Sequence, residues 1–162
     1  MPADLVKLTE CLGAPRVLVV GDYMLDRYLW GSVERISQEA PIPVLNVDIT
    51  RRDHRPGGGG SVVADLAALG ARPDAAGIIG RDPQGSELRE LIKAKGAKVQ
   101  GLLVDPGRPT TVKTRTIARS QQMLRIDEES DAEIGAAMAG RLNASTAAIR
   151  PRPWSTPSAA PV

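Results

Sequence analysis

The middle of the 162-residue chain alternates short apolar segments with segments of helical periodicity, and this alternation restricts the fold more than any other feature. The apolar segments at residues 16–20, 75–79 and 99–104 lack polar alternation, which is typical of strands buried on both faces. Helical spacing predicts helices at 62–69 and 83–95 between them. This order is typical of βαβ units, so we predict an α/β fold in which helices cover a parallel sheet.

The ends of both predicted helices carry boundary signals. Asp82 followed by Pro83 predicts an N-cap with proline at the first helical position. Gly70 and Gly96 follow the last apolar residue of each helix and predict C-terminal caps. The two helices are therefore supported by periodicity and by capping residues.

Two further segments, 41–48 and 109–127, alternate polar and apolar residues and do not suit a sheet buried on both faces. We expect them to form exposed antiparallel strands of a second, smaller element, with an edge strand after Pro41 and a turn at Ser120–Gln121. One face of the second segment would carry Lys113, Arg115, Ile117 and Arg119. Three cations on one face fit either a solvated surface or a site for an anionic substrate such as a phosphosugar.

Composition restricts the partners and the compartment. The net charge of +2 argues against nucleic-acid and membrane binding. The single cysteine, Cys11, excludes an internal disulfide framework and a cysteine-based metal site. No apolar segment approaches the ~18 residues of a membrane span, and residues 1–13 have the pattern of an amphipathic helix rather than a signal peptide. We therefore expect a soluble, cytoplasmic protein.

The end of the sequence has a different character. Residues 143–162 contain prolines, no acidic residue and no periodicity, so we predict that the folded part is 1–142 and that the remainder is disordered. We also hypothesise that the natural fold continues past residue 142 and that this chain leaves it through a reading-frame change or an early stop. The genomic sequence downstream tests that hypothesis.

Three places carry residues suited to ligand binding. Asp22 and Asp26 follow a buried strand, at the end where open α/β sheets bind ligands, and their carboxylates fit either polyol hydroxyls or turn capping. Residues 57–60 are four glycines, which fit a flexible connector or a loop whose N–H groups approach an anion. They form neither a GxGxxG motif nor a P-loop. His54 is expected in a solvated loop.

Three segments together resemble one family. They are GDYMLDRYLWGSVERISQEAPIPVLNV, RPGGGGSVVADLAALGA and RPTTVKTRTIARSQQMLRIDEE. Between about Arg16 and Glu129 the chain resembles the N-terminal half of the PfkB/ribokinase-type carbohydrate kinases, and within them the heptose 7-phosphate kinases most. The resemblance implies a ribokinase-like three-layer α/β sandwich with a small β-sheet lid, truncated to its N-terminal half, with lid segments near 28–50 and 109–127.

The resemblance also implies a reaction and a substrate site. The reaction would move the ATP γ-phosphate to the anomeric hydroxyl of D-glycero-D-manno-heptose 7-phosphate, on the route to ADP-heptose for lipopolysaccharide cores. Asp26 matches the family's ligand of the sugar hydroxyls, and Gly57 and Gly58 match its diglycine close to the sugar. Lys113 and Arg115 lie in the lid segment and are the candidates for the 7-phosphate.

The sequence departs from the family pattern in two ways. Ser61 stands where the family usually has an asparagine that reaches the sugar, and Asp65 stands where it has another asparagine. The Gly-Ala-Gly-Asp motif that supplies the family's anion hole and catalytic base is missing. No catalytic residue or metal ligand is therefore assigned, and ATP and Mg²⁺ are implied only by the family.

Three functions remain open from the sequence. The first is the sugar-binding half of a heptose phosphate kinase, with a phosphorylated sugar as its partner. The second is a catalytically inactive sugar-binding or dimerisation module, with a homodimer formed through the lid. The third is a kinase for another sugar, such as a ribose- or fructose-type substrate, although the cationic lid face disfavours a neutral sugar.

Overall fold

The computed structural model describes residues 13–149 and contains two sheets and three helices. In chain order, the elements are β1 (Arg16–Val20), β2 (Tyr23–Ile36), β3 (Pro43–Gly58), α2 (Gly59–Ala68), β4 (Arg72–Gly80), α3 (Pro83–Ala94), β5 (Lys98–Asp105), β6 (Thr111–Ala118), β7 (Gln121–Glu128) and α4 (Ala136–Ala148).

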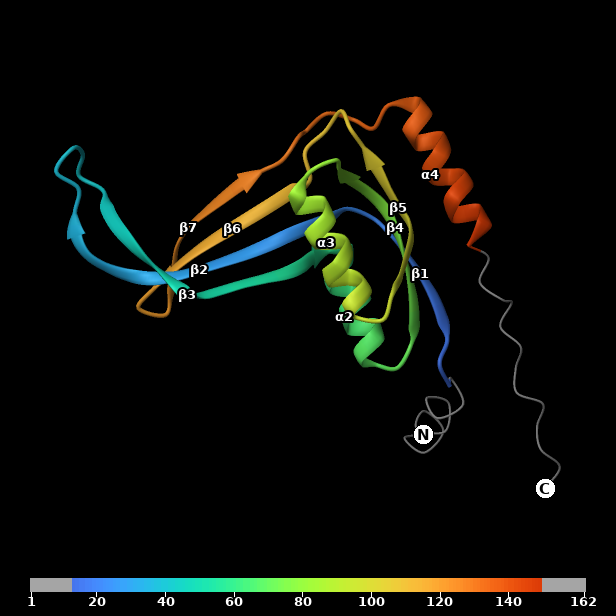
Figure 1. Cartoon of the computed structure of the whole chain (residues 1–162), viewed down its shortest axis with the longest axis horizontal. Coiled ribbons are helices and arrows are strands. Elements are labelled where there is room, and N and C mark those ends of the chain that lie inside the picture. Colours follow the sequence, from blue (N-terminus) through green and yellow to red (C-terminus); the bar gives the residue numbers. More distant parts are fainter. Residues whose placement is uncertain (1–12, 150–162) are drawn as a thin grey trace, which may run out of the picture.

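The first sheet is parallel, in the order β1-β4-β5, and we call this sheet and its helices the body. Helices α2 and α3 cover one face of the sheet, and α4 lies against β4 and β5 on the other face (Figure 1). This arrangement gives three layers and confirms the predicted α/β fold with its two βαβ helices. The core lies between the sheet and the first two helices, where it is built from Tyr23, Val63, Ala75, Ile79, Leu88, Ile92, Ala97 and Leu102.

The second sheet has four strands in the order β3-β2-β6-β7, and we call it the lid. Strand β2 pairs antiparallel with β3 and parallel with β6, and β7 pairs antiparallel with β6. The lid extends away from the body as a long curved sheet (Figure 1). Strands of both expected segments, 41–48 and 109–127, lie in this sheet, and β3 is an edge strand as predicted.

The lid is longer than the sequence indicated. Strand β3 continues through the basic segment 51–55 to Gly58, where a loop was expected, because β2 offers pairing partners to residues 52–58. The turn before β7 lies at Arg119–Ser120, both with positive φ, instead of Ser120–Gln121. Arg119 consequently belongs to a turn, and the prediction that it shares a strand face with Lys113 and Arg115 is wrong.

The C-terminal boundary also differs from the expectation. Helix α4 continues past residue 142 to Ala148, so the prediction of disorder is wrong for residues 143–148. The segment 143–148 is rich in alanine, which has the highest helix propensity, and that propensity supports the last turns without a buried side chain. The predicted helix at residues 1–13 lies almost entirely outside the described residues, as do Cys11 and the remainder of the predicted tail. Within residues 13–149, no helix is long and apolar enough to span a membrane.

Candidate sugar site at the root of the lid

The four-glycine segment forms a fixed turn in which strand β3 passes directly into helix α2. Gly58 has φ of 58° and occupies the N-cap position of α2. A side chain there would place its Cβ 2.5 Å from the carbonyl oxygen of Asp22, and the N–H of Gly59 donates to that same oxygen at 2.8 Å. The positive φ and the close approach both require glycine. The flexible-connector interpretation is therefore wrong.

Asp26 lies on β2 directly beside this turn. Gly57 pairs with Met24 across the lid, and a Cβ at Gly57 would lie 2.5 Å from Oδ2 of Asp26. The Asp26 carboxylate therefore occupies space that a side chain at position 57 would otherwise fill. The structure brings together Asp26, Gly57 and Gly58, which the sequence selected from two separate segments.

Arg115 holds the Asp26 carboxylate from the neighbouring strand β6. Its Nη1 donates to Oδ1 of Asp26, and its guanidinium lies 5.5 Å from the ring centroid of Tyr28. This hydrogen bond raises the pKa of Arg115, with a further contribution from the negative charge of Asp26. Both side chains are largely buried, with exposed fractions of 22% for Arg115 and 15% for Asp26. Arg115 therefore fixes the orientation of the Asp26 carboxylate, which remains partly accessible to solvent.

Lys113 is also paired within the lid. Its Nζ donates to Glu129 at 3.0 Å and to Asp127 at 3.1 Å. The hydrogen bond to Glu129 and then that to Asp127 raise the pKa of Lys113. The bonds from Lys113 and Arg125 lower the pKa of Asp127 against the opposing effect of burial. The cations at 113 and 115 are therefore neutralised by carboxylates, which removes the repulsion expected on this face.

The same face of the lid carries an aromatic and cationic row that the sequence reasoning missed. Tyr28 and Trp30 stack with ring centroids 5.7 Å apart. The Arg55 guanidinium lies 5.0 Å from the Tyr28 ring centroid, and Arg51 lies 4.8 Å from that of Trp30. Asp26, Tyr28 and Trp30 are spaced two residues apart on β2, so this period-2 pattern was the available signal.

A pocket of about 350 Å³ lies where the lid joins the body. Its lining includes Asp22 just before β2, Met24 near the start of β2, Lys113 from β6 and Glu129 after β7. Asp22 follows β1, so the pocket opens at the carboxyl end of a parallel strand, where open α/β sheets bind ligands. These polar lining residues therefore come from the segment between β1 and β2 and from the lid, and one of them, Lys113, is opposite Asp26 in the β2–β6 register. We call this hollow the junction pocket.

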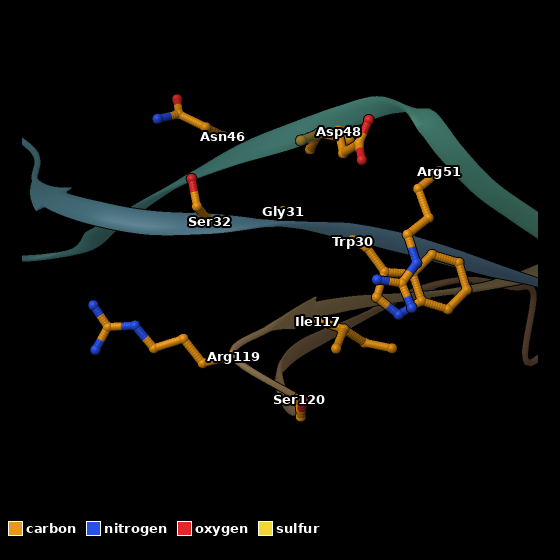
Figure 2. A pocket seen from close by; sticks show the side chains of 10 residues that line it. Trp30, Gly31, Ser32, Asn46, Asp48, Arg51, Ile117, Arg119 and Ser120 are labelled. Carbon is orange, nitrogen blue, oxygen red and sulfur yellow. The ribbon is translucent and has the colours of Figure 1, made fainter.

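A second pocket, of about 570 Å³, lies farther out on the lid (Figure 2). Its lining includes residues of β2 beginning at Trp30, residues of β3 beginning at Asn46, and Arg119 and Ser120 of the turn before β7. The Arg51 guanidinium lies over the Trp30 ring, and Arg119 points away from both (Figure 2). The two pockets share no lining residue, so this one is a separate hollow.

The comparisons with known proteins assign the chain to a family. A model described as pfkB family carbohydrate kinase matches residues 14–145. The chain belongs to the pfkB family of carbohydrate kinases. This result confirms the resemblance found in the sequence.

Curated relatives and solved structures agree with this family. The chain is 50% identical over 123 residues to the bifunctional protein HldE of Geobacter sulfurreducens, covering 76% of this chain and 25% of that protein. It is 46% identical over 138 residues to HldE of Paramagnetospirillum magneticum, covering 85% and 28%. The chain thus spans about a quarter of the length of these pfkB relatives.

Two solved ribokinases share the fold. One is from Cryptococcus neoformans in complex with ADP, with a TM-score of 0.54, 18% identity, and coverage of 78% of this chain and 38% of that one. The other is from Arabidopsis thaliana, complexed with ribose and ATP, with a TM-score of 0.54, 18% identity, and coverage of 72% and 36%. Both confirm the ribokinase-like architecture of this pfkB chain.

The side chain of Ser61, a predicted site residue, bonds to the backbone five residues earlier in the chain. It lies in the first turn of α2, and its hydroxyl donates to the carbonyl of Pro56 at 3.1 Å. This bond stabilises the start of the helix behind the glycine turn. Asp65, the other departure from the pfkB pattern, is exposed on the same helix.

The described residues offer no ligand set for the Mg²⁺ ion that the pfkB family implies. Among residues 13–149, no three His, Cys, Asp or Glu side chains are grouped in a way that could hold a metal ion. What this part of the chain offers is a carboxylate at Asp26 that can accept hydrogen bonds from a polyol, together with N–H donors on Lys113 and Arg115 whose charge is offset by carboxylates.

Proposed function

We propose that this chain is the sugar-binding part of an ATP-dependent kinase whose acceptor is D-glycero-D-manno-heptose 7-phosphate. The phosphoryl group would pass from ATP to the anomeric hydroxyl and give the 1,7-bisphosphate. The proposal rests on membership of the carbohydrate kinase family, on similarity to HldE proteins and on the ribokinase fold, which one solved relative uses with ribose and ATP. The proposed location is the cytoplasm, because the phosphoryl donor is ATP.

One observation carries the proposal most directly. The Asp26 carboxylate is fixed by Arg115 and lies against Gly57, and its register partner Lys113 lines the junction pocket. A carboxylate only accepts hydrogen bonds, so it suits the hydroxyl groups of a sugar. The absence of a Cβ at Gly57 lets the backbone pack directly against Asp26, which holds the carboxylate in place for a sugar.

Arg115 and Lys113 remain our candidates for the substrate phosphate. Arg115 uses Nη1 for Asp26, and its guanidinium has further N–H donors that suit a phosphate oxygen. Lys113 lies between two carboxylates and is 16% exposed, so it contributes charge to the junction pocket that it lines. Arg115 would then contact the sugar ligand Asp26 and the phosphate at the same time.

Calorimetric titration of the chain with heptose 7-phosphate tests this function. Asp26→Asn should weaken binding about 10- to 100-fold, because hydrogen bonds to a charged acceptor contribute roughly 1.5–3 kcal/mol. The matched control is Asp48→Asn, since Asp48 is exposed near the far end of β3 and bonds only to Thr50 among side chains. The unphosphorylated heptose, ribose and fructose serve as comparison ligands.

Each result of the titration has a defined meaning. Binding of heptose 7-phosphate that is weakened by Asp26→Asn and unaffected by Asp48→Asn supports the proposal. Tighter binding of ribose or fructose than of heptose 7-phosphate would transfer the function to another sugar kinase. No measurable binding of any phosphorylated sugar by the unmodified chain overturns it.

A second proposed role is pairing with another copy of the chain through the lid. Strand β7 has a neighbour on one side only, and it exposes Met123, Leu124 and Ile126. An apolar edge strand of this kind is a template for pairing with another chain. We expect light scattering after size exclusion to give a dimer that Leu124→Lys dissociates and that Leu69→Lys, on an exposed body residue, leaves intact. A monomeric unmodified chain contradicts this role.

A further inference from the structure

Three polar side chains, Arg27, His54 and Glu87, join the back of the lid to the body. The Nδ1–H of His54, on β3, donates to Oε1 of Glu87, on α3. Nη2 of Arg27, on β2, lies 3.8 Å from Oε2 of the same carboxylate. Within the described residues, Arg27 and His54 form these contacts with Glu87 and with no other carboxylate. His54 was expected in a solvated loop, and the structure places it in this contact instead.

The cluster lies directly behind the candidate sugar site. Arg27 and His54 are opposite each other in the β2–β3 register, and so are their neighbours Asp26 and Arg55. Successive side chains on a strand point to opposite faces. Asp26 therefore contacts Arg115 on the front of the lid, while Arg27 contacts α3 behind it. Any shift of the back contacts moves the carboxylate in front.

Helix α3 gives Glu87 a rigid base. The next residue, Leu88, is fully buried in the body core, and so is Ile92 one turn later. On the lid side, Glu87 faces Arg27. Among the described residues, Nε of Arg27 is buried without a hydrogen-bond partner, which is energetically unfavourable. An unsatisfied buried donor persists only where its surroundings hold it in place. The Glu87 carboxylate provides the charge that holds this guanidinium.

We propose that Glu87 is a positioning residue that fixes the root of β2 and β3 against α3 and thereby aims Asp26 at the sugar. The sugar-binding consequence rests on the proposed function, whereas the anchoring of the strands does not. The three side chains are about a quarter to a third exposed, so solvent screens the contact and its effect is moderate. The expected loss on removing Glu87 is about 2- to 5-fold in sugar-phosphate affinity, in line with ion pairs of this exposure.

The test compares Glu87→Ala with Glu90→Ala on the same helix. Among residues 13–149, Glu90 pairs only with Lys93, at 3.7 Å, and it is exposed, so it matches the change in charge and helix propensity. Hydrogen exchange is measured by mass spectrometry, and heptose 7-phosphate affinity by calorimetry. Glu87→Ala should speed exchange of the amides at 23–29 and 52–58 several-fold and leave those of β4 unchanged. Glu90→Ala should leave both regions unchanged.

Variants at His54 separate positioning from general destabilisation. His54→Ala should reproduce the Glu87→Ala exchange, and the double variant should be no worse than either single variant. His54→Asn should restore most of the protection, because its amide N–H can donate from nearly the place of Nδ1. Equal exchange in Glu87→Ala and Glu90→Ala overturns the proposal, and so does faster exchange without loss of affinity.

The two proposals fail differently. A chain that binds no phosphorylated sugar overturns the proposed function, and the exchange at 23–29 and 52–58 still decides whether Glu87 fixes the lid. A chain that binds the sugar equally well with and without Glu87 keeps the function and overturns the positioning role.

Discussion

Replacement of Leu88 by Ala should lower the free energy of unfolding by about 2–5 kcal/mol, the usual cost of truncating a buried leucine. Leu88 is fully buried on α3 and belongs to the core that includes Val63, Ile79 and Leu102. The cost combines the lost transfer energy of the side chain with the cavity it leaves. A small domain has only about 5–15 kcal/mol of total stability, so the variant should be close to unfolding.

Urea unfolding followed by circular dichroism measures this effect. Leu69→Ala is the control, because Leu69 ends α2 with 83% of its surface exposed and should change stability by less than about 0.5 kcal/mol. Equal urea midpoints for the two variants would show that α3 is not packed on the sheet as described.

Replacement of Asp82 by Ala should destabilise the body by about 2–4 kcal/mol. Oδ1 of Asp82 caps α3 by accepting from the N–H of Gly85 at 2.7 Å, and Oδ2 accepts from the N–H of Thr110 at 2.7 Å. Loss of a cap costs about 0.5–2 kcal/mol, and an unsatisfied buried N–H costs about 1–3 kcal/mol. Thr110 is buried and precedes β6, so the same carboxylate also fixes the chain where it enters the lid.

The contribution of Asp82 should depend on pH in a defined direction. Burial raises the pKa of Asp82, but the hydrogen bonds from Thr110 and Gly85 outweigh it and hold the pKa below its ordinary value. A depressed folded-state pKa stabilises the fold above the unfolded pKa of about 4, and that stabilisation is lost as the pH falls through the folded value. The difference between the original chain and Asp82→Ala should therefore be full at pH 7 and shrink below about pH 4.

Urea titrations across this pH range check the prediction. Asp65→Ala serves as the control, because Asp65 is exposed on α2 and its carboxylate makes no hydrogen bond within residues 13–149. A gap between the original chain and Asp82→Ala that widens in acid would contradict the assignment of Asp82 as a charged cap.

The body could be predicted because its signals are local. The apolar segments at 16–20, 75–79 and 99–104 became β1, β4 and β5, and Asp82 caps α3 as expected. The lid could not be predicted to the same extent, because its strands depend on partners far away in the chain. The basic segment 51–55 belongs to a strand because β2 pairs with residues 52–55. In addition, the guanidiniums of Arg51 and Arg55 lie over the rings of Trp30 and Tyr28.

The candidate site shows the same division. The glycine turn and Asp26 were found from their residue types and order along the chain. The ion pairs of Arg115 and Lys113 could not be anticipated, because Asp26 lies 89 residues before Arg115 and Glu129 lies 16 residues after Lys113. The contact between His54 and Glu87 likewise requires that α3 pack behind β3, which no local pattern indicates.

The parallel pairing of β2 with β6 affects the order in which parts of the protein can fold during synthesis. Strands β2 and β3 leave the ribosome early and can form a hairpin, but the remaining edge of β2 has no partner until β6 emerges. Pairings of such long sequence separation form slowly, because a long loop must close first. Arg115 consequently reaches Asp26 only after α2, β4, α3 and β5 have been synthesised, so the candidate sugar site is completed later than the hairpin of β2 and β3.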